Sequence, residues 1–413
     1  MKKLIGTVAM AALLASAAFA ELSIGNWVRQ LWSPVAYNGD DVMTGSQNSW
    51  GTPGRSAGVG LNWVGDDEKA GAAFSFVVDP WGNTHGLDGN NIIWVKPWDF
   101  LKLTLGHWDG INDISTVNTA SWDWVRPNNW LDNLYAENEH TGAMIELFPV
   151  DGLTVRVGLP FVNPDKSYRM FETIHAEVEY TITDLLGIKL AWLGGDNDHR
   201  GPFYTKNAYK YDSKYMNVGE VDVLLQLLAV ENLQLDVGAR INILNADYDD
   251  VAPQVRAGMT QKEQDDYSKL SFYGQQEFQM RPSALIGLKA GYNINDKFSV
   301  KADFAVQTWK KTEFVKHKPD FAFGVGVGVG LTDSLTLDAD FRALLKGDID
   351  YGVATETADP TFSFLVGLNY ACSSNAVVGI GFQGKTNGGE FSPLSANSDN
   401  FGFAVPIKVE VSF

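Results

Sequence analysis

Residues 297–307 read KFSVKADFAVQ, and apolar and polar side chains alternate along this stretch. The apolar positions are Phe298, Val300, Ala302, Phe304 and Val306, and the polar positions are Ser299, Lys301, Asp303 and Gln307. Successive side chains of a β-strand point to opposite faces, whereas a helix repeats every 3.6 residues. The stretch therefore predicts a strand with one apolar face and one face in contact with water.

The same alternation recurs along the chain, for example in LQLDVGARINI (233–243) and LTLDADFRALL (335–345). Many such segments are joined in pairs by short turns rich in Asn, Asp, Gly or Pro, as in GYNINDKFSV (291–300), which is the signal of a β-hairpin. Eight hairpins and one strand at each end predict about eighteen strands. Sixteen is the alternative, reached if NIIWVKPWDFLKL (91–103) is not a hairpin.

Longer, polar connections separate the hairpins, and 108–139 is expected to be the longest of them. An even number of strands with short turns at one side and long loops at the other is typical of a transmembrane antiparallel β-barrel, with short periplasmic turns and long extracellular loops. Hydrocarbon supplies no hydrogen-bond partners, so such a sheet must close. A soluble β-sandwich also alternates, but its domains are about 100 residues long, and no domain boundary interrupts this chain.

The N-terminus, MKKLIGTVAMAALLASAAFA, has two lysines, a short apolar stretch and small residues ending in Ala20. This is the pattern of a secretory signal peptide over 1–20, which leaves 21–413 as a single barrel domain. The net charge of −18 argues against nucleic acid as a partner, because phosphates are bound by an excess of Lys and Arg. The single cysteine, Cys372, excludes an internal disulfide.

The last residues, FAVPIKVEVSF (403–413), place apolar side chains at the odd positions and Lys408 and Glu410 between them. Closure of the barrel requires this strand to pair with the first strand, which is expected to begin at Leu22. Pro406 lacks the N–H that a strand needs, so an irregularity is predicted there.

The signal peptide, the hairpin series and the terminal KVEVSF together resemble a Gram-negative outer-membrane porin. The segment ELSIGNWVRQLWSPVAYNGD (21–40) is similar to porin-like outer-membrane proteins of spirochaetes, especially treponemes. The resemblance implies a bacterial outer-membrane location, a water-filled channel, and a trimeric or monomeric assembly. It also implies that Phe413 is an assembly signal read by the barrel-assembly machinery, with outer-membrane lipid around the barrel.

The polar strand faces should line the pore, and barrels of 16–18 strands leave an aqueous channel. The predicted lumen-lining residues are Arg156, Glu177, Arg240, Asp303, Asp338, Arg342, Lys408 and Glu410. In the porin family the third extracellular loop commonly folds into the barrel, and the matching loop here is 108–139. The hypothetical pore constriction consists of Asp109, Asp113, Asp123, Arg126, Asp132, Trp122, Trp124 and Trp130.

These features predict passive diffusion of small hydrophilic solutes or ions, without a cofactor, a metal or a catalytic set. Histidines near carboxylates, His175 with Glu177 and His199 with Asp196 and Asp198, are the strongest candidates for an outer-membrane hydrolase, and they do not form a convincing one. A second alternative is a surface adhesin or antigen that uses the barrel only as an anchor.

Overall fold

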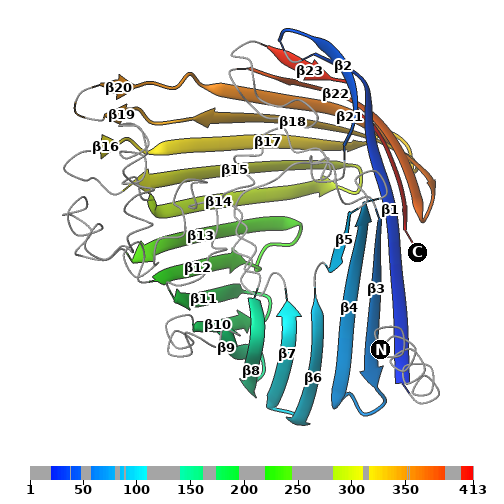
Figure 1. Cartoon of the computed structure of the whole chain (residues 1–413), viewed down its shortest axis with the longest axis vertical. Coiled ribbons are helices and arrows are strands. Elements are labelled where there is room, and N and C mark those ends of the chain that lie inside the picture. Colours follow the sequence, from blue (N-terminus) through cyan, green and yellow to red (C-terminus); the bar gives the residue numbers. More distant parts are fainter. Residues whose placement is uncertain are drawn as a thin grey trace, which may run out of the picture.

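The structure is a computed structural model of the whole chain. It describes residues 20–37, 39–47, 57–79, 84–87, 90–108, 140–160, 174–194, 219–243, 282–309, 316–350, 352, 354–386 and 401–412. Figure 1 shows strands that follow one another around a barrel, with the blue first strand beside the orange and red last strands. Within the described residues no helix is long and apolar enough to cross a membrane.

Eighteen strands of the described chain pair in a closed ring, and every pair is antiparallel. The prediction of eighteen is therefore confirmed, and the alternative of sixteen is wrong because 91–103 does form a hairpin. In ring order the strands are β1 (Ala20–Tyr37), β3 (Ala57–Gly65), β4 (Ala70–Asp79), β6 (Asn91–Trp98), β7 (Leu101–Trp108), β8 (His140–Val150), β9 (Leu153–Pro160), β10 (His175–Ile182), β11 (Leu186–Gly194), β12 (Gly219–Leu227), β13 (Leu233–Ile243), β14 (Pro282–Asn295), β15 (Phe298–Trp309), β17 (Asp320–Gly330), β18 (Leu335–Leu345), β21 (Thr361–Ser373), β22 (Ala376–Lys385) and β24 (Ile407–Ser412).

The remaining strands belong to the long connections or to the end of the chain. They are β2 (Val42–Gln47), β5 (Thr84–Leu87), β16 (Lys316–His317), β19 (Ile349–Asp350), β20 (Thr355–Glu356) and β23 (Gly402–Ala404). The strands β16, β19 and β20 form a small separate sheet on the long-loop side of β15, β17, β18 and β21 (Figure 1).

The last strand closes the barrel as predicted. β24 lies between β22 and β1, and it pairs with β1 from Trp27 opposite Ser412 to Trp32 opposite Ile407. The irregularity predicted at Pro406 is also present, because β23 ends at Ala404 and β24 begins at Ile407. The chain stays attached through this break, since the N–H of Val405 donates to the carbonyl of Val35 over 2.9 Å.

The two faces of the sheet differ as the alternation predicts. Along β17 the odd-numbered residues Phe321, Phe323 and Val325 are exposed, and the even-numbered residues between them are buried. A single-layer barrel can bury side chains only on the face that it encloses. The alternating polar face is therefore the inner one, and the apolar face is the outer one.

The short turns lie together at one end of the barrel, where tyrosines mark the outer face. Tyr180, Tyr292 and Tyr370 are exposed and stand within a few residues of short turns. The β8–β9 turn contains Gly152, whose φ of 79° is a left-handed conformation. Its carbonyl accepts a hydrogen bond from the N–H of Thr181 over 2.8 Å, which fixes this turn against β10.

The expectation that 108–139 is the longest connection stays a prediction, because 109–139 and the chain between β13 and β14, residues 244–281, lie outside the described residues.

Candidate functional site

A row of charged side chains crosses the inner face of five adjacent strands. Lys102 on β7 lies opposite Glu146 on β8, and Glu146 lies opposite Arg156 on β9. Arg156 in turn lies opposite Glu177 on β10, whose neighbour Glu179 lies opposite Lys189 on β11. Period-two alternation turns each residue inward, and the strand register brings them to one level. We call these six residues the β7–β11 charge row.

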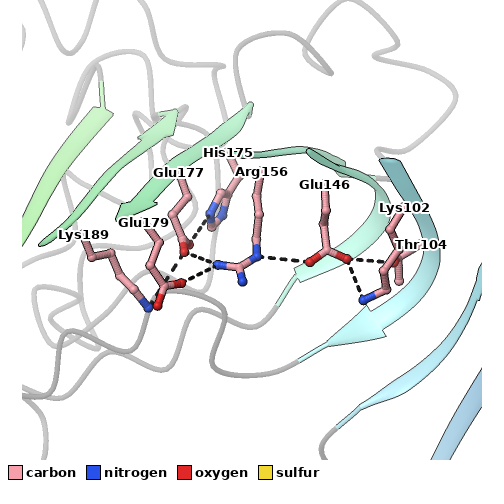
Figure 2. Close-up of polar contacts among 8 residues, drawn as sticks. All are labelled: Lys102, Thr104, Glu146, Arg156, His175, Glu177, Glu179 and Lys189. Atoms are coloured by element: carbon pink, nitrogen blue, oxygen red, sulfur yellow. Dashed lines mark hydrogen bonds and ion pairs between the residues drawn. The ribbon is translucent and has the colours of Figure 1, made fainter. Parts of the chain in front are cut away.

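Figure 2 shows that Arg156 is the centre of this row. Its Nε atom donates to Glu146 over 3.2 Å, and its Nη1 atom donates to Glu177 over 2.5 Å and to Glu179 over 2.9 Å. Three carboxylates therefore hold one guanidinium group in a fixed position.

The two lysines complete the charge row at its ends. Lys102 Nζ lies 2.7 Å from Glu146, which also accepts a 3.3 Å hydrogen bond from Thr104 (Figure 2). Lys189 Nζ lies 3.8 Å from Glu177. The three carboxylates are thus matched by three cations, which offsets the cost of placing charges on a partly desolvated surface.

A second ion pair joins the inner faces of β12 and β13. Asp222 lies directly opposite Arg240, and the guanidinium binds both carboxylate oxygens through Nε and Nη2 at 3.1 and 3.2 Å. Both side chains are buried. This two-point geometry is the strong form of an arginine–carboxylate contact.

A third ion pair reaches across an intervening strand. Asp303 on β15 and Arg342 on β18 flank Gly324 of β17, and Arg342 Nη1 lies 3.1 Å from Asp303 Oδ2. A Cβ atom at Gly324 would lie 2.8 Å from Asp303 Oδ1 and 3.1 Å from Arg342 Nη1. Gly324, the first glycine of GVGVGVG (324–330), therefore leaves the space in which Asp303 and Arg342 meet across β17.

The other predicted lumen-lining residues also lie on inward positions. Asp338 accepts a hydrogen bond from Asn369 over 2.5 Å. Lys408 is buried opposite Leu31, and Glu410 lies opposite Arg29 at the seam. The structure thus brings Arg156 together with Glu177, and Asp303 together with Arg342, while the remaining predicted residues are distributed around the wall.

The predicted constriction residues lie outside the described part of the chain. This applies to Asp109, Asp113, Asp123, Arg126, Asp132, Trp122, Trp124 and Trp130, and the proposed assembly signal, Phe413, also lies outside it.

Sequence reasoning missed some inner-face residues. Glu146 lies in GAMIELF (142–148), whose alternation is weak because small and apolar residues occupy the inner positions Gly142 and Met144. Gln383 and Lys385 are also buried on the inner face, at the end of β22. A register shift between Leu147 and Val150 also breaks the alternation beside the turn, so counting in steps of two from the turn does not find Glu146.

In the first histidine candidate for catalysis, His175 with Glu177, the carboxylate is bound to an arginine. His175 Nε2 lies 3.7 Å from Glu177 Oε2, which is beyond hydrogen-bond distance, and Glu177 already binds Arg156. The second candidate, His199 with Asp196 and Asp198, lies outside the described residues. Within the described ranges no group of three or more His, Cys, Asp or Glu residues is arranged to hold a metal ion.

Comparisons with known proteins agree with this architecture. No protein-family model and no curated protein sequence matches the chain. Among solved structures, an anion-selective porin from Comamonas acidovorans is 11% identical with a TM-score of 0.51, covering 95% of this chain and 100% of that one. The outer-membrane channel DcaP of Acinetobacter baumannii is 9% identical with a TM-score of 0.51, covering 96% and 99% of the two chains.

A third similar structure is OccK11 (OpdR) of Pseudomonas aeruginosa, 8% identical with a TM-score of 0.51 over 95% of this chain and 96% of that one. At such low identity these likenesses establish the fold, which is that of outer-membrane porins. None of the comparisons supports the spirochaete resemblance of residues 21–40.

Proposed function

We propose that this chain is a bacterial outer-membrane porin, a water-filled channel for passive diffusion of small hydrophilic solutes. The observation that carries the proposal is the closed ring of eighteen strands with an apolar outer face and a charged inner face. A bilayer requires the closed ring, because spanning strands can leave no unpaired edge. The charged inner face suits water and polar solutes in the pore.

The inner wall favours a pore that admits ions of both signs. The β7–β11 charge row carries three cations and three carboxylates, and the pairs Asp222–Arg240 and Asp303–Arg342 are each neutral in sum. Rings of charge set ion preference in channels. A wall with paired charges gives only a small preference, so ion selectivity is expected to be weak.

The loop between β7 and β8 is proposed to narrow the pore. Its composition supports this role, because Trp122, Trp124 and Trp130 stand among Asp123, Arg126 and Asp132, and disordered segments are poor in aromatic residues. Deleting residues 115–135 should then raise the single-channel conductance. An unchanged conductance in a correctly folded deletion variant would refute the constriction.

Three partners are proposed for the assembled protein. Exposed Val, Leu, Ile and Phe side chains around the barrel suit lipid contact. Phe413 suits recognition by the barrel-assembly machinery, and a homotrimer is the proposed oligomer. Mass measurement of the detergent-extracted protein distinguishes a trimer from a monomer.

Planar-bilayer recording of the purified full chain tests the proposal directly. Stepwise insertion of ohmic channels is expected, with currents that scale with salt concentration. Silent protein, with the barrel shown to be folded by circular dichroism, would contradict the porin and favour an anchored adhesin or antigen. Hydrolysis of peptide or lipid substrates by the purified chain would instead favour the enzyme.

A further inference from the structure

Three side chains meet at the long-loop rim of the barrel, between the end of β15 and the start of β17. Trp309 is the last residue of β15, Asp320 is the first residue of β17, and His317 lies between them on β16. The rings of His317 and Trp309 are stacked, with centroids 4.2 Å apart and an interplanar angle of 26°. His317 Nε2 lies 3.2 Å from Asp320 Oδ1. We call these three residues the rim cluster.

Asp320 is the buried acid of the rim cluster, with 2% of its surface exposed. Trp309 Nε1 donates to its Oδ2 atom over 2.9 Å, and the N–H of Gly347 donates to its Oδ1 atom over 2.7 Å. Both donors are neutral, so they orient the carboxylate without cancelling its charge. A buried charge is costly unless it is paired. Among the described residues, His317 is the only basic side chain within ion-pair distance of Asp320.

His317 is the matching base, and it is also buried, with 9% of its surface exposed. Neither of its ring nitrogens makes a hydrogen bond in the described part of the chain. A neutral imidazole has one donor and one acceptor nitrogen, whereas the imidazolium has two donors. Only the imidazolium brings an opposite charge to Asp320 and a cation to the face of the Trp309 ring. Protonation of His317 therefore strengthens both of its contacts.

The other charged groups near His317 have different positions or partners. Lys318 Nζ lies 2.6 Å from Asp348 Oδ2, and Asp350 accepts a hydrogen bond from the N–H of Gly352 over 2.8 Å. The remaining charged side chains of the surrounding described segments are exposed, namely Lys316, Lys346 and Glu356. No described carboxylate except Asp320 lies within 4 Å of a ring nitrogen of His317. Asp320 is thus the acid that responds to the charge of His317.

The rim cluster joins the small sheet of β16, β19 and β20 to the barrel. β16 pairs with β19 through His317 opposite Ile349, and β19 pairs with β20. Figure 1 shows this sheet beyond the long-loop ends of β15, β17, β18 and β21. Gly347, which precedes β19, binds the same carboxylate as His317. Two segments of the sheet region therefore converge on Asp320.

The geometry points to a pH-dependent latch, in which the His317 imidazolium between Trp309 and Asp320 fastens the β16–β19–β20 sheet to the rim of the barrel. Imidazole is the side chain that changes its charge between about pH 5 and pH 8. In acid the ring is charged and the latch is closed. In alkali the ring is neutral, Asp320 loses its cation, and the sheet opens more often. The latch is a property of the folded rim and does not depend on the channel function proposed above.

Hydrogen–deuterium exchange of the full chain in detergent micelles tests the latch. Exchange is measured at about pH 5 and at about pH 8, and each rate is corrected for the intrinsic effect of pH on amide exchange. We expect protection of β16, β19 and β20 to be about tenfold lower at the higher pH, which corresponds to about 1.4 kcal/mol. Protection of the barrel strands β14 and β15 should not change, and it also shows that each variant is folded.

His317→Gln is neutral at both pH values, and Asp320→Asn removes the acid. Either substitution should give low protection of the small sheet at both pH values. The matched control is His175→Gln, which removes another buried histidine beside a carboxylate, on β10, and should keep the tenfold difference of the wild type. Equal protection of the wild-type sheet at the two pH values would overturn the proposal. So would a pH dependence that survives His317→Gln, or one that is lost in His175→Gln.

Discussion

At the scale of single residues, Arg156 has the most consequential position in the described wall. Its guanidinium is bound to Glu146, Glu177 and Glu179, and the side chain of Glu177 is 0% exposed. An ion pair in such a place adds little net stability compared with apolar residues, but removal of one partner leaves an uncompensated buried charge. The effect of a substitution therefore depends on which partner is removed.

Arg156→Met should destabilise the barrel by about 3–5 kcal/mol, because Glu177 then loses its main cation. It should also shift the pore towards cations, since three carboxylates remain with two lysines. Equilibrium unfolding in denaturant measures the first effect, and the reversal potential in a salt gradient measures the second. Arg156→Lys, which keeps the charge, is the control for selectivity. An unfolding free energy for Arg156→Met equal to that of the wild type would show that Arg156 does not stabilise the buried carboxylates.

The ion pair of Lys69 and Asp99 is exposed to solvent, unlike the contacts of Arg156 with the buried Glu177. Lys69 Nζ lies 2.7 Å from Asp99 Oδ1, and the hydrogen bond from Lys69 holds the pKa of this carboxyl below its usual value. The pKa of Asp99 is lower in the folded protein than in the unfolded chain. The pair therefore stabilises the fold at pH values above the ordinary carboxyl pKa, and this stabilisation is lost as the pH falls through the lowered pKa of Asp99. Such solvent-exposed pairs contribute little to stability. Lys69→Met is therefore the matched control for the stability effect of Arg156→Met.

Gly324→Ala should weaken the contact between Asp303 and Arg342. The added methyl group would lie 2.8 Å from Asp303 Oδ1, so the two side chains must move apart. We expect a loss of about 1–3 kcal/mol in unfolding free energy, typical of overpacking. The control is Gly25→Ala in β1, where a Cβ atom would meet nothing within 4 Å. If both substitutions have the same effect, the close approach over β17 does not limit stability.

At the scale of elements, the sequence predicts the strands well because the cause is local. Alternation and turn residues lie within ten to twelve positions, and they identify hairpins such as 91–103 and the break at Pro406. The register between strands has no such local mark. Two contacts depend on the register between neighbouring strands. One is the alignment of Glu146 with Arg156 and Glu177. The other is the contact of Asp303 with Arg342 across Gly324.

Strand ends are also hard to place from the sequence. A strand with a weakly alternating sequence and a polar loop that contains apolar residues look alike over short windows.

The outer face of the strands makes a prediction about depth in the bilayer. Val366 lies in the middle of β21 and is 46% exposed, whereas Val150 lies at the end of β8 beside a short turn and is 60% exposed. A charged side chain on the lipid face costs about 2–4 kcal/mol at the midplane and about 0–1 near the interface. Val366→Arg should therefore reduce the free energy of folding into lipid vesicles by that larger amount, and Val150→Arg should have a small effect.

Equal costs at the two positions would mean that the barrel does not sit across a bilayer with its short turns near one interface. The comparison is informative because exposure differs little between the two residues. The two residues differ mainly in their position along the strand, so the comparison tests the depth of each side chain in the bilayer.

At the scale of the whole molecule, closure depends on one seam between the two ends of the barrel domain. β1 holds β3 on one side and β24 on the other, and the six paired residues of β24 carry most of the seam. An unpaired strand edge in hydrocarbon leaves several backbone groups without partners, each at a cost of several kcal/mol. The barrel should therefore be either closed or unfolded, with no stable open sheet.

A disulfide across the seam tests closure directly. Val28 lies opposite Val411, and directly paired residues of antiparallel strands have Cα atoms about 4.5–5.5 Å apart, within the range that a disulfide spans. In a Cys372→Ser background, Val28→Cys with Val411→Cys should cross-link rapidly in the folded protein, and the product should resist unfolding more than its reduced form. Val28→Cys with Val409→Cys is the matched control, because these positions are diagonal and about 7–8 Å apart. Equal cross-linking of the two pairs would show that the first and last strands are not held in this register, and without that register the enclosed pore would have no continuous wall.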